Sequence, residues 1–181
     1  MKKKIITLII SFITILYLLF NVGFQCGNVR IGKQIDFFQD TKSDYSNSSF
    51  YRNYYNSNKL LVINLWATWC KPCLEEVPLL NSIKEMYIED SINFLGLSID
   101  NDSVKLVTYL AKDIFKFKDL TLANLNYRNT IINLLDNEPL DKHQLTRVIP
   151  KTYLVKNKKV LKIIEGSIDK DELIAEINKL K

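Results

Sequence analysis

The chain has 181 residues, of which 47% are apolar, so it can build one packed domain with a short additional segment and is not a disordered chain. The net charge of +5 is unevenly placed. Lys2, Lys3 and Lys4 supply three of the 25 basic residues, and the other 22 nearly balance the 20 acids. A nearly neutral domain gives no reason to expect binding to nucleic acid.

The first 26 residues have the composition of a segment directed to a membrane. Three lysines precede an uncharged run from Ile5 to Val22, and as a helix this run is about 27 Å long, close to a hydrocarbon core of about 30 Å. Basic residues stay on the cytoplasmic side, so we expect residues 1–26 to be a membrane anchor and the domain to face the periplasm or extracytoplasmic side. A cleaved signal peptide, or a lipoprotein signal with lipidation of Cys26, would also export the domain.

Residues 27–59 are expected to form a leading strand and loop region at the start of the domain. The stretch from Ser43 to Lys59 is rich in Ser, Asn and Tyr and has no clear period, which predicts a loop with one short helix. We expect its aromatic side chains to pack against the edge of the domain rather than to contact a partner. These side chains are Tyr45, Phe50, Tyr51, Tyr54 and Tyr55.

From residue 60 onward the sequence alternates between strand and helix patterns. The apolar run from Leu60 to Trp66 predicts a central buried strand, and residues 92–99 predict a second one. Residues 72–88 carry apolar side chains at helical spacing between these strands. A further helix is expected over residues 102–115. Its predicted buried face consists of Val104, Val107, Leu110 and Ala111.

The second half of the domain predicts a hairpin and a final helix. Residues 116–147 are less regular and are interpreted as an insertion with one helix around Tyr127–Leu135. Residues 152–156 and 160–164 predict an antiparallel hairpin, and Asp169 is the expected N-cap of the last helix. Residues 60–181 therefore predict an α/β domain, a mixed central β-sheet flanked by helices on both faces.

Two cysteines lie between the first predicted strand and the helix that follows it, in the sequence Trp69-Cys70-Lys71-Pro72-Cys73. Free N–H groups and the positive dipole end at a helix N-terminus stabilise a thiolate, so Cys70 is predicted to be an exposed, anionic nucleophile. Lys71 adds a cation, and Pro72 is tolerated in a first helical turn. Cys73 is predicted to be more buried and to displace the sulfur that Cys70 captures.

Other functions of the cysteine pair remain open at this point. The pair suits a structural disulfide, a thiol peroxidase, or an exported binding protein that holds a metal such as Cu(I). A zinc site needs about four ligands, and the further candidates of the soft type are Cys26 and His143. His143 lies in the irregular stretch, where we expect a surface or capping role. We expect no cofactor.

The segment Val62–Cys73 (VINLWATWCKPC) resembles the active-site strand and turn of the thioredoxin superfamily. The next residues, Leu74–Pro78 (LEEVP), narrow the resemblance to the TlpA/ResA-like extracytoplasmic thiol–disulfide oxidoreductases, and Ile149–Val155 (IPKTYLV) is similar to their cis-proline segment. The resemblance covers roughly residues 31–180. It implies a thioredoxin-like fold for the domain.

The resemblance also implies roles for residues outside the cysteine pair. Pro150 would be cis and lie against the pair, Ile149 would offer backbone hydrogen bonds to an extended client segment, and Trp69 would flank the reactive thiol. Glu76 would lie near Cys73 and handle its proton, with burial raising its pKa. The simpler interpretation of Glu76 is favourable charge in the first helical turn.

One departure from thioredoxin concerns Asn64, which stands where thioredoxin has a buried Asp. An amide cannot accept a proton in that role, so the task would fall to Glu76 or to water. The resemblance implies a membrane-anchored enzyme that reduces disulfides of exported proteins, with apocytochrome c during cytochrome c maturation as the suggested client. A transmembrane electron donor is an expected partner, because no glutathione pool keeps thiols reduced outside the cytoplasm.

Overall fold

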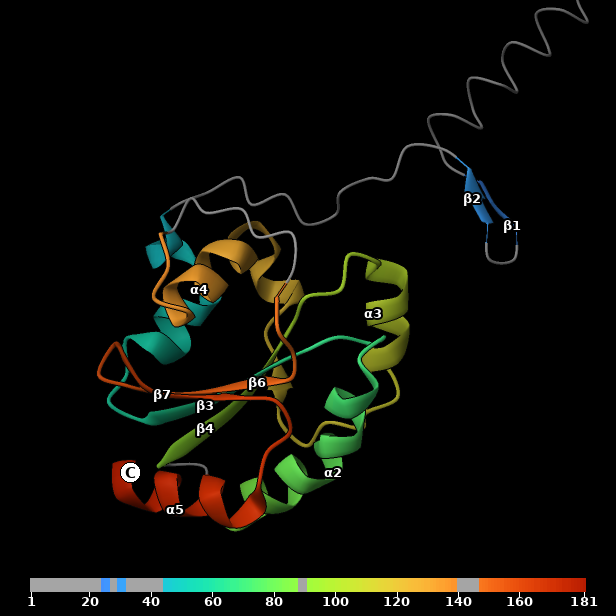
Figure 1. Ribbon diagram of the computed structural model, residues 1–181. Helices are drawn as coiled ribbons and strands as arrows, with labels where there is room; N and C mark the ends of the chain where they lie inside the picture. Colours follow the sequence, from blue (N-terminus) through green and yellow to red (C-terminus); the bar gives the residue numbers. More distant parts are fainter. Residues whose placement is uncertain (1–23, 27–28, 32–43, 88–90, 140–146) are drawn as a thin grey trace, which may run out of the picture. The chain divides into compact units, whose positions relative to one another are not determined.

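The computed structural model describes residues 24–26, 29–31, 44–87, 91–139 and 147–181 (Figure 1). The chain divides into two compact units, Met1–Asp36 and Phe37–Lys181. In the first unit, β1 (Phe24–Cys26) pairs antiparallel with β2 (Val29–Ile31). The predicted anchor run lies outside the described residues. Among the residues that are described, no helix has the length and apolarity needed to cross a membrane.

The second unit is built on a five-stranded mixed sheet (Figure 1). In sheet order its strands are β5 (Lys118–Asp119), β4 (Ile92–Ser98), β3 (Leu60–Trp66), β6 (Lys151–Lys156) and β7 (Lys159–Glu165). The central strand β3 pairs parallel with β4 and antiparallel with β6. This arrangement confirms the predicted fold class. The edge strand β5 was not predicted, because two residues are too few to show a period.

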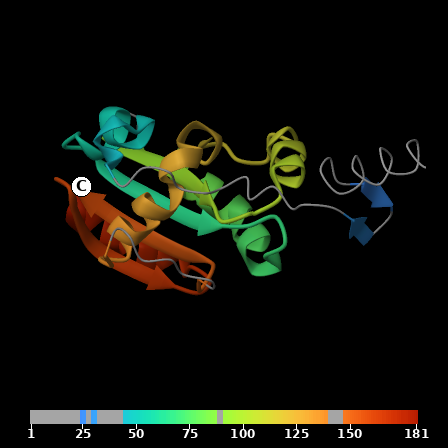
Figure 2. The ribbon, with the colours of Figure 1, turned by 90° about the horizontal axis from the view of Figure 1, so that it is seen from above.

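Helices cover both faces of this sheet, so its central strands are buried on both sides. The core on one face includes side chains from α2 (Lys71–Glu85), α3 (Ser103–Leu110) and α5 (Lys170–Leu180). The core on the other face includes α4 (Arg128–Leu135) and the short helix η2 (Tyr51–Tyr55). Figure 1 shows α2 and α5 across the sheet from α4, and Figure 2 views α4 lying over the strands.

The side chains of β3 alternate between these two cores, as the period of a strand requires. Val62 and Trp66 belong to the core on the α2 side, whereas Ile63 and Leu65 belong to the core on the α4 side. Asn64 lies between Val62 and Trp66 in this alternation. It therefore shares their face of the sheet and is the polar residue on the α2 side of the strand.

The segment before β3 packs as expected. Phe50 and Tyr55 are buried in the core on the α4 side, and the Tyr55 hydroxyl donates a hydrogen bond to the Lys158 carbonyl at 2.8 Å. Asn157 and Lys158 form the tip of the β6–β7 hairpin with φ of 51° and 61°, as a tight two-residue turn between twisted strands requires. At the last helix, Asp169 is the N-cap and accepts a hydrogen bond from the Glu172 N–H at 2.9 Å, as predicted.

The prediction for the helix after β4 was wrong in its length and in most of its buried face, of which Leu110 alone packs against the core. The helix α3 ends at Leu110, and Asp113 has a left-handed φ of 52°, so the helix cannot extend to residue 115. Leu106 is buried, while Val104 and Val107 are exposed. The reason is the position of Trp66, whose ring packs against Tyr109 and so turns that side of α3 inward.

Candidate active site

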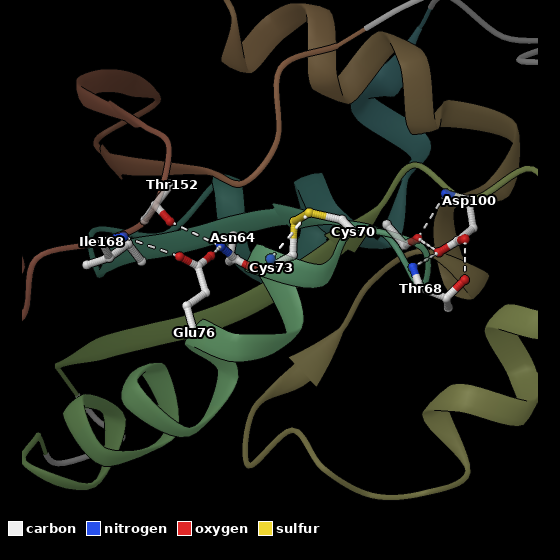
Figure 3. Close-up of a disulfide and its surroundings, with 9 residues drawn as sticks. Asn64, Thr68, Cys70, Cys73, Glu76, Asp100, Thr152 and Ile168 are labelled. Atoms are coloured by element: carbon white, nitrogen blue, oxygen red, sulfur yellow. Dashed lines mark hydrogen bonds between the residues drawn. A yellow bond between two sulfur atoms is a disulfide. The ribbon is translucent and has the colours of Figure 1, made fainter.

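The two cysteines lie at the carboxyl end of β3 and form a disulfide, with an S–S distance of 2.00 Å and a Cα–Cα distance of 5.3 Å (Figure 3). Cys70 is the N-cap of α2, and its Sγ accepts a hydrogen bond from the Cys73 N–H at 3.3 Å. A backbone N–H of the first helical turn therefore points at the sulfur of Cys70. This geometry confirms the predicted strand-to-helix junction and favours negative charge on that sulfur.

The expectation that Cys70 would be exposed was wrong for the oxidised state that the structure shows. Cys70 is 5% exposed and Cys73 is fully buried, because both belong to the core on the α2 side of the sheet. The neighbouring Trp69 is 65% exposed. The surface beside the disulfide is therefore formed by a large aromatic side chain rather than by sulfur.

Lys71, which was predicted to tune the redox pair, lies on the surface of α2. Its side chain is exposed, and its ammonium nitrogen lies 3.6 Å from a carboxylate oxygen of Glu75, which is exposed as well. Ion pairs of this kind are screened by water and salt. Pro72 lies in the first turn of α2, where its missing N–H removes no helical hydrogen bond. The helix terminus adds to the positive potential at Cys70.

Glu76 is a buried carboxyl group, 5% exposed, one helical turn after Cys73 on the same side of α2. Its Oε1 accepts a hydrogen bond from the Asn64 Nδ2 at 2.8 Å, and its Oε2 accepts one from the Ile168 N–H at 3.3 Å (Figure 3). Burial raises the pKa of Glu76, and these two hydrogen bonds oppose the rise only in part. Glu76 therefore keeps its proton to a higher pH than an exposed glutamate does.

Asn64 joins this carboxyl group to the neighbouring strand. Asn64 on β3 lies opposite Thr152 on β6, and its Nδ2 donates to the Thr152 Oγ1 at 3.2 Å as well as to Glu76. The Oδ1 of Asn64 is buried and has no hydrogen-bond partner among the described residues. Rotation of the amide would present this oxygen to a protonated Glu76. The pair therefore fits both protonation states of the carboxyl group.

The loop that leads from β3 to Cys70 is held by Asp100, which sequence reasoning missed. The buried Asp100 carboxylate accepts hydrogen bonds from the Thr68 N–H at 2.8 Å, the Thr68 Oγ1 at 2.6 Å and the Ser98 Oγ at 2.6 Å (Figure 3). A signal was present in the sequence. An aspartate directly after the second buried strand lies at the edge where parallel strands end together, beside the turn that follows the first strand.

The cis-proline segment is confirmed, because the peptide bond between Ile149 and Pro150 is cis. Pro150 is buried, Ile149 is half-buried, and the Pro150 carbonyl accepts a hydrogen bond from the Gly166 N–H at 2.9 Å. The next residue, Lys151, opens β6 and pairs with Leu65 near the end of β3. The segment therefore enters the sheet beside the strand end from which the cysteine loop leaves.

A zinc site would need several ligands close together, and the described residues do not provide such a group. Across residues 44–87, 91–139 and 147–181, no three His, Cys, Asp or Glu side chains are grouped so that they could hold a metal ion. His143 lies outside the described residues. Of the residues predicted for the site, the structure brings together Cys70, Cys73 and Glu76 along α2.

The disulfide of a Cys-x-x-Cys motif at a strand-to-helix junction, with a cis-proline at the start of the neighbouring strand, is the arrangement that the resemblance to thioredoxins implied. The Thioredoxin family model matches residues 42–114, which include both cysteines and Glu76. This part of the chain thus matches the thioredoxin domain that the sequence resemblance implied. A thioredoxin domain with such a pair supports oxidoreductase activity.

Comparison with known proteins gives the particular relatives. The chain is 25% identical over 124 residues to the thiol-disulfide oxidoreductase ResA of Geobacillus thermodenitrificans and 26% identical over 123 residues to ResA of Bacillus thuringiensis. The matched regions are 68% and 67% of this chain, and the chain spans 64% of the length of each relative. Its similarity to ResA thus extends over about two thirds of this chain and leaves about a third of each relative unmatched.

Solved structures support the same fold. A putative thiol:disulfide interchange protein DsbE from Chlorobium tepidum aligns with a TM-score of 0.52 at 18% identity, over 69% of this chain and 82% of that one. A putative thioredoxin from Neisseria meningitidis aligns with a TM-score of 0.50 at 20% identity, over 71% and 78% of the two chains. At these identities the likeness concerns the fold.

Proposed function

We propose that this protein is a membrane-anchored, extracytoplasmic thiol–disulfide oxidoreductase that reduces disulfides in exported proteins. The observation that carries the proposal is the Cys70–Cys73 disulfide at the N-terminus of α2, with the buried carboxyl group of Glu76 one turn further along the helix. An apolar core filler would serve a structural disulfide better than a buried carboxyl group, because burying a carboxylate costs free energy.

The reaction begins from the reduced pair. The Cys70 thiolate attacks a disulfide of the client, so a mixed disulfide forms and one client thiolate leaves. Cys73 then attacks the Cys70 sulfur, which releases the second client thiol and closes the Cys70–Cys73 disulfide. Two electrons pass to the client, and the structure represents the oxidised product. A membrane electron donor would return the pair to the dithiol state, because no glutathione pool does so outside the cytoplasm.

Glu76 would accept the proton that Cys73 loses when it becomes a nucleophile. It lies one helical turn from Cys73, and burial raises its pKa. A carboxyl group with a raised pKa is better matched to proton exchange at neutral pH than an ordinary glutamate. Asn64 supports this role, because its amide can face either protonation state of Glu76.

Client proteins would bind beside the disulfide as an extended segment. Ile149 would offer backbone hydrogen bonds to that segment, in the manner of strand addition, and Trp69 would give it an exposed apolar surface. Apocytochrome c during cytochrome c maturation is the client we propose. Residues 1–26 would hold the domain at the outer side of the membrane.

A turnover assay with the two cysteine variants tests this function. The dithiol protein should reduce a protein disulfide such as oxidised insulin. Cys70→Ser should abolish the reaction, because the attacking thiol is lost and the remaining Cys73 is fully buried. Cys73→Ser should instead accumulate a mixed disulfide between Cys70 and the client, visible on a non-reducing gel. A Cys70→Ser protein with undiminished activity would refute the proposal.

The direction of electron flow is tested by the reduction potential of the same pair. The hydrogen bond from the Cys73 N–H and the helix terminus favour the thiolate, which makes a pair more oxidising, whereas burial of both sulfurs opposes ionisation. We expect burial to prevail. Equilibration with glutathione or dithiothreitol buffers should give a potential at or below about −250 mV, and a value near −120 mV would instead indicate an oxidant.

A further inference from the structure

A largely enclosed cluster of charged side chains includes residues on both sides of Pro150. Asp136, the C-cap of α4, accepts a hydrogen bond through its Oδ2 from the Arg147 Nη1 at 2.8 Å. Its Oδ1 accepts from the Lys151 Nζ at 3.1 Å and from the Tyr153 hydroxyl at 2.8 Å. The Asp136 carboxylate thus contacts one residue that precedes the cis-proline, Arg147, and two that follow it, Lys151 and Tyr153.

The cluster is enclosed enough for its geometry to be well defined. The side chains of Arg147, Asp136 and Lys151 are only 5%, 10% and 11% exposed. Charge-assisted hydrogen bonds between enclosed groups are strong, and removing one partner leaves a costly unpaired charge. The ion pairs at this segment therefore restrain it much more than ion pairs on the surface would.

The contact to Arg147 also fixes an orientation. Its Nη1 donates to Asp136, and its Nη2 donates to the Oδ1 of Asn133 at 2.7 Å. Asn133 and Asp136 are one turn apart at the end of α4, so they present two acceptors to one planar guanidinium group. Arg147 is thereby held at two points on the helix, two residues before Ile149.

The groups after the proline are held in the same way. Burial lowers the pKa of Lys151, but its hydrogen bonds to Asp136 and Glu165 outweigh this effect, so the net pKa is raised and the ammonium group stays charged. Burial and the Asp136 carboxylate both raise the pKa of Tyr153, so its hydroxyl remains a donor. Neither contact to Asp136 is therefore lost by titration at neutral pH.

We propose that Asp136 is a positioning residue for client recognition, through which α4 fixes the cis-proline segment in the conformation that receives a client backbone. This inference rests on the proposed function and assigns a role to the helix within residues 116–147. Asp136 touches neither sulfur nor client. It acts through Arg147 and Lys151, which flank Ile149 and Pro150, so its loss should impair binding of an extended client more than the chemistry at Cys70.

The test compares Asp136→Asn with Glu165→Gln in the full chain, each reacted with oxidised insulin and with the small disulfide 5,5′-dithiobis(2-nitrobenzoic acid). The Asp136→Asn substitution would replace one acceptor oxygen of the carboxylate by an amide donor within the cluster. The expected result is a rise in KM for insulin of about tenfold with little change in kcat and in the rate with the small disulfide. Glu165 also contacts Lys151, at 3.1 Å, but is 59% exposed, so its variant should match the wild type in both reactions.

Two outcomes would overturn the inference while leaving the proposed function intact. One is an unchanged KM for insulin in Asp136→Asn, and the other is an equal loss with both disulfides, which would indicate general damage to the fold. Should Asp136→Asn not fold, Arg147→Lys takes its place, because it keeps the charge but loses the two-point contact. This variant must still raise the KM for insulin, by less than the rise of about tenfold expected for Asp136→Asn. A wild-type protein that reduces neither disulfide would instead refute the proposed function.

Discussion

At the scale of single residues, the proposed chemistry depends on a carboxyl group and an amide that the sequence places 12 positions apart. Glu76 on α2 and Asn64 on β3 meet at 2.8 Å between the helix and the sheet. In thioredoxin the strand position carries a carboxyl group, and here the acid lies on the helix while the strand supplies the amide. In the proposed mechanism the proton-accepting group therefore lies on the helix that carries the cysteines rather than on the sheet.

Replacing this acid should change the pH dependence of the reaction. As pH rises through the raised pKa of Glu76, the carboxylate forms and can accept the Cys73 proton, so the wild-type rate should rise over that range. Glu76→Gln should lack this rise of rate with pH and should be slower than the wild type by about 100-fold at neutral pH. Steady-state rates measured from pH 4 to 9 give the comparison, with Glu75→Gln as the exposed control on the same helix.

The raised pKa of Glu76 also makes the folding stability of the protein depend on pH. Because the folded pKa of Glu76 is raised, its contribution to stability is fully present below the unfolded pKa and is lost as pH rises through the folded one. Denaturation of Glu76→Gln should therefore show a smaller loss of stability over that pH range than the wild type. An identical pH dependence of rate in Glu76→Gln and wild type would remove Glu76 from the proton path.

The candidate site could be predicted from the sequence only where its residues are local. Cys70 and Cys73 were placed together by their spacing at the start of a predicted helix, and the family resemblance added Glu76 on the same helix. Thr152 and Ile168 are far away in the sequence and meet Asn64 and Glu76 only through the register of β3 with β6 and the turn after β7. No local pattern encodes such meetings, because strand pairing is decided by the whole sheet.

At the scale of elements, the central strands were predicted well, whereas the buried face of α3 was predicted poorly. The continuous apolar runs of β3 and β4 are strong signals for strands buried on both faces. The face of α3 was wrong, because the aromatic side chains of Trp66 and Tyr109 decide which side turns inward, and a list of apolar positions does not contain that choice. The helix α4 was placed correctly, but its role at the cis-proline segment rests on side-chain contacts that no periodicity shows.

The parallel pairing of β4 with β5, where Gly96 lies opposite Asp119, offers a sharp test of packing between elements. A Cβ added at Gly96 would lie 2.9 Å from the Oδ2 of Asp119 and 3.3 Å from the Nε1 of Trp66, and these two atoms are hydrogen-bonded to each other at 2.8 Å. Gly96→Ala should therefore destabilise the protein by about 1–3 kcal/mol through overpacking. Urea denaturation followed by circular dichroism measures this loss.

A second glycine separates steric from conformational effects in that experiment. Gly166 has a φ of 83° and open space around the position of a Cβ, so Gly166→Ala should cost about 1–2 kcal/mol through backbone strain alone. The indole environment should change only in Gly96→Ala, which is visible in near-ultraviolet circular dichroism. A Gly96→Ala protein as stable as the wild type would contradict the packing described for Trp66 and Asp119.

At the scale of the whole molecule, the proposed location depends on residues 1–26. A basic start followed by 18 uncharged residues predicts an anchor. The full chain expressed in bacteria should therefore remain in the membrane pellet after an alkaline carbonate wash, with the domain accessible to protease from the outer side. Recovery of the full chain in the carbonate supernatant would contradict the anchor.

The same cells distinguish an uncleaved anchor from a lipoprotein. Growth with labelled palmitate should leave the protein unlabelled if the apolar run is itself the anchor. Incorporation that disappears in Cys26→Ser would instead assign the attachment to a lipid on that residue. Both results are compatible with the export of the domain, and only the first keeps the 18-residue run in the mature protein.

The alternation of β3 between two cores has a consequence for how this sequence can change. Deleting one residue from the strand would rotate every following side chain by half a turn, so the amide of Asn64 would be sent among the leucines and isoleucines beneath α4, and a leucine would be set against the Glu76 carboxyl group. Length in this strand is therefore under tighter constraint than residue identity: the apolar positions tolerate exchange among themselves, but the count of residues from Leu60 to the first cysteine does not.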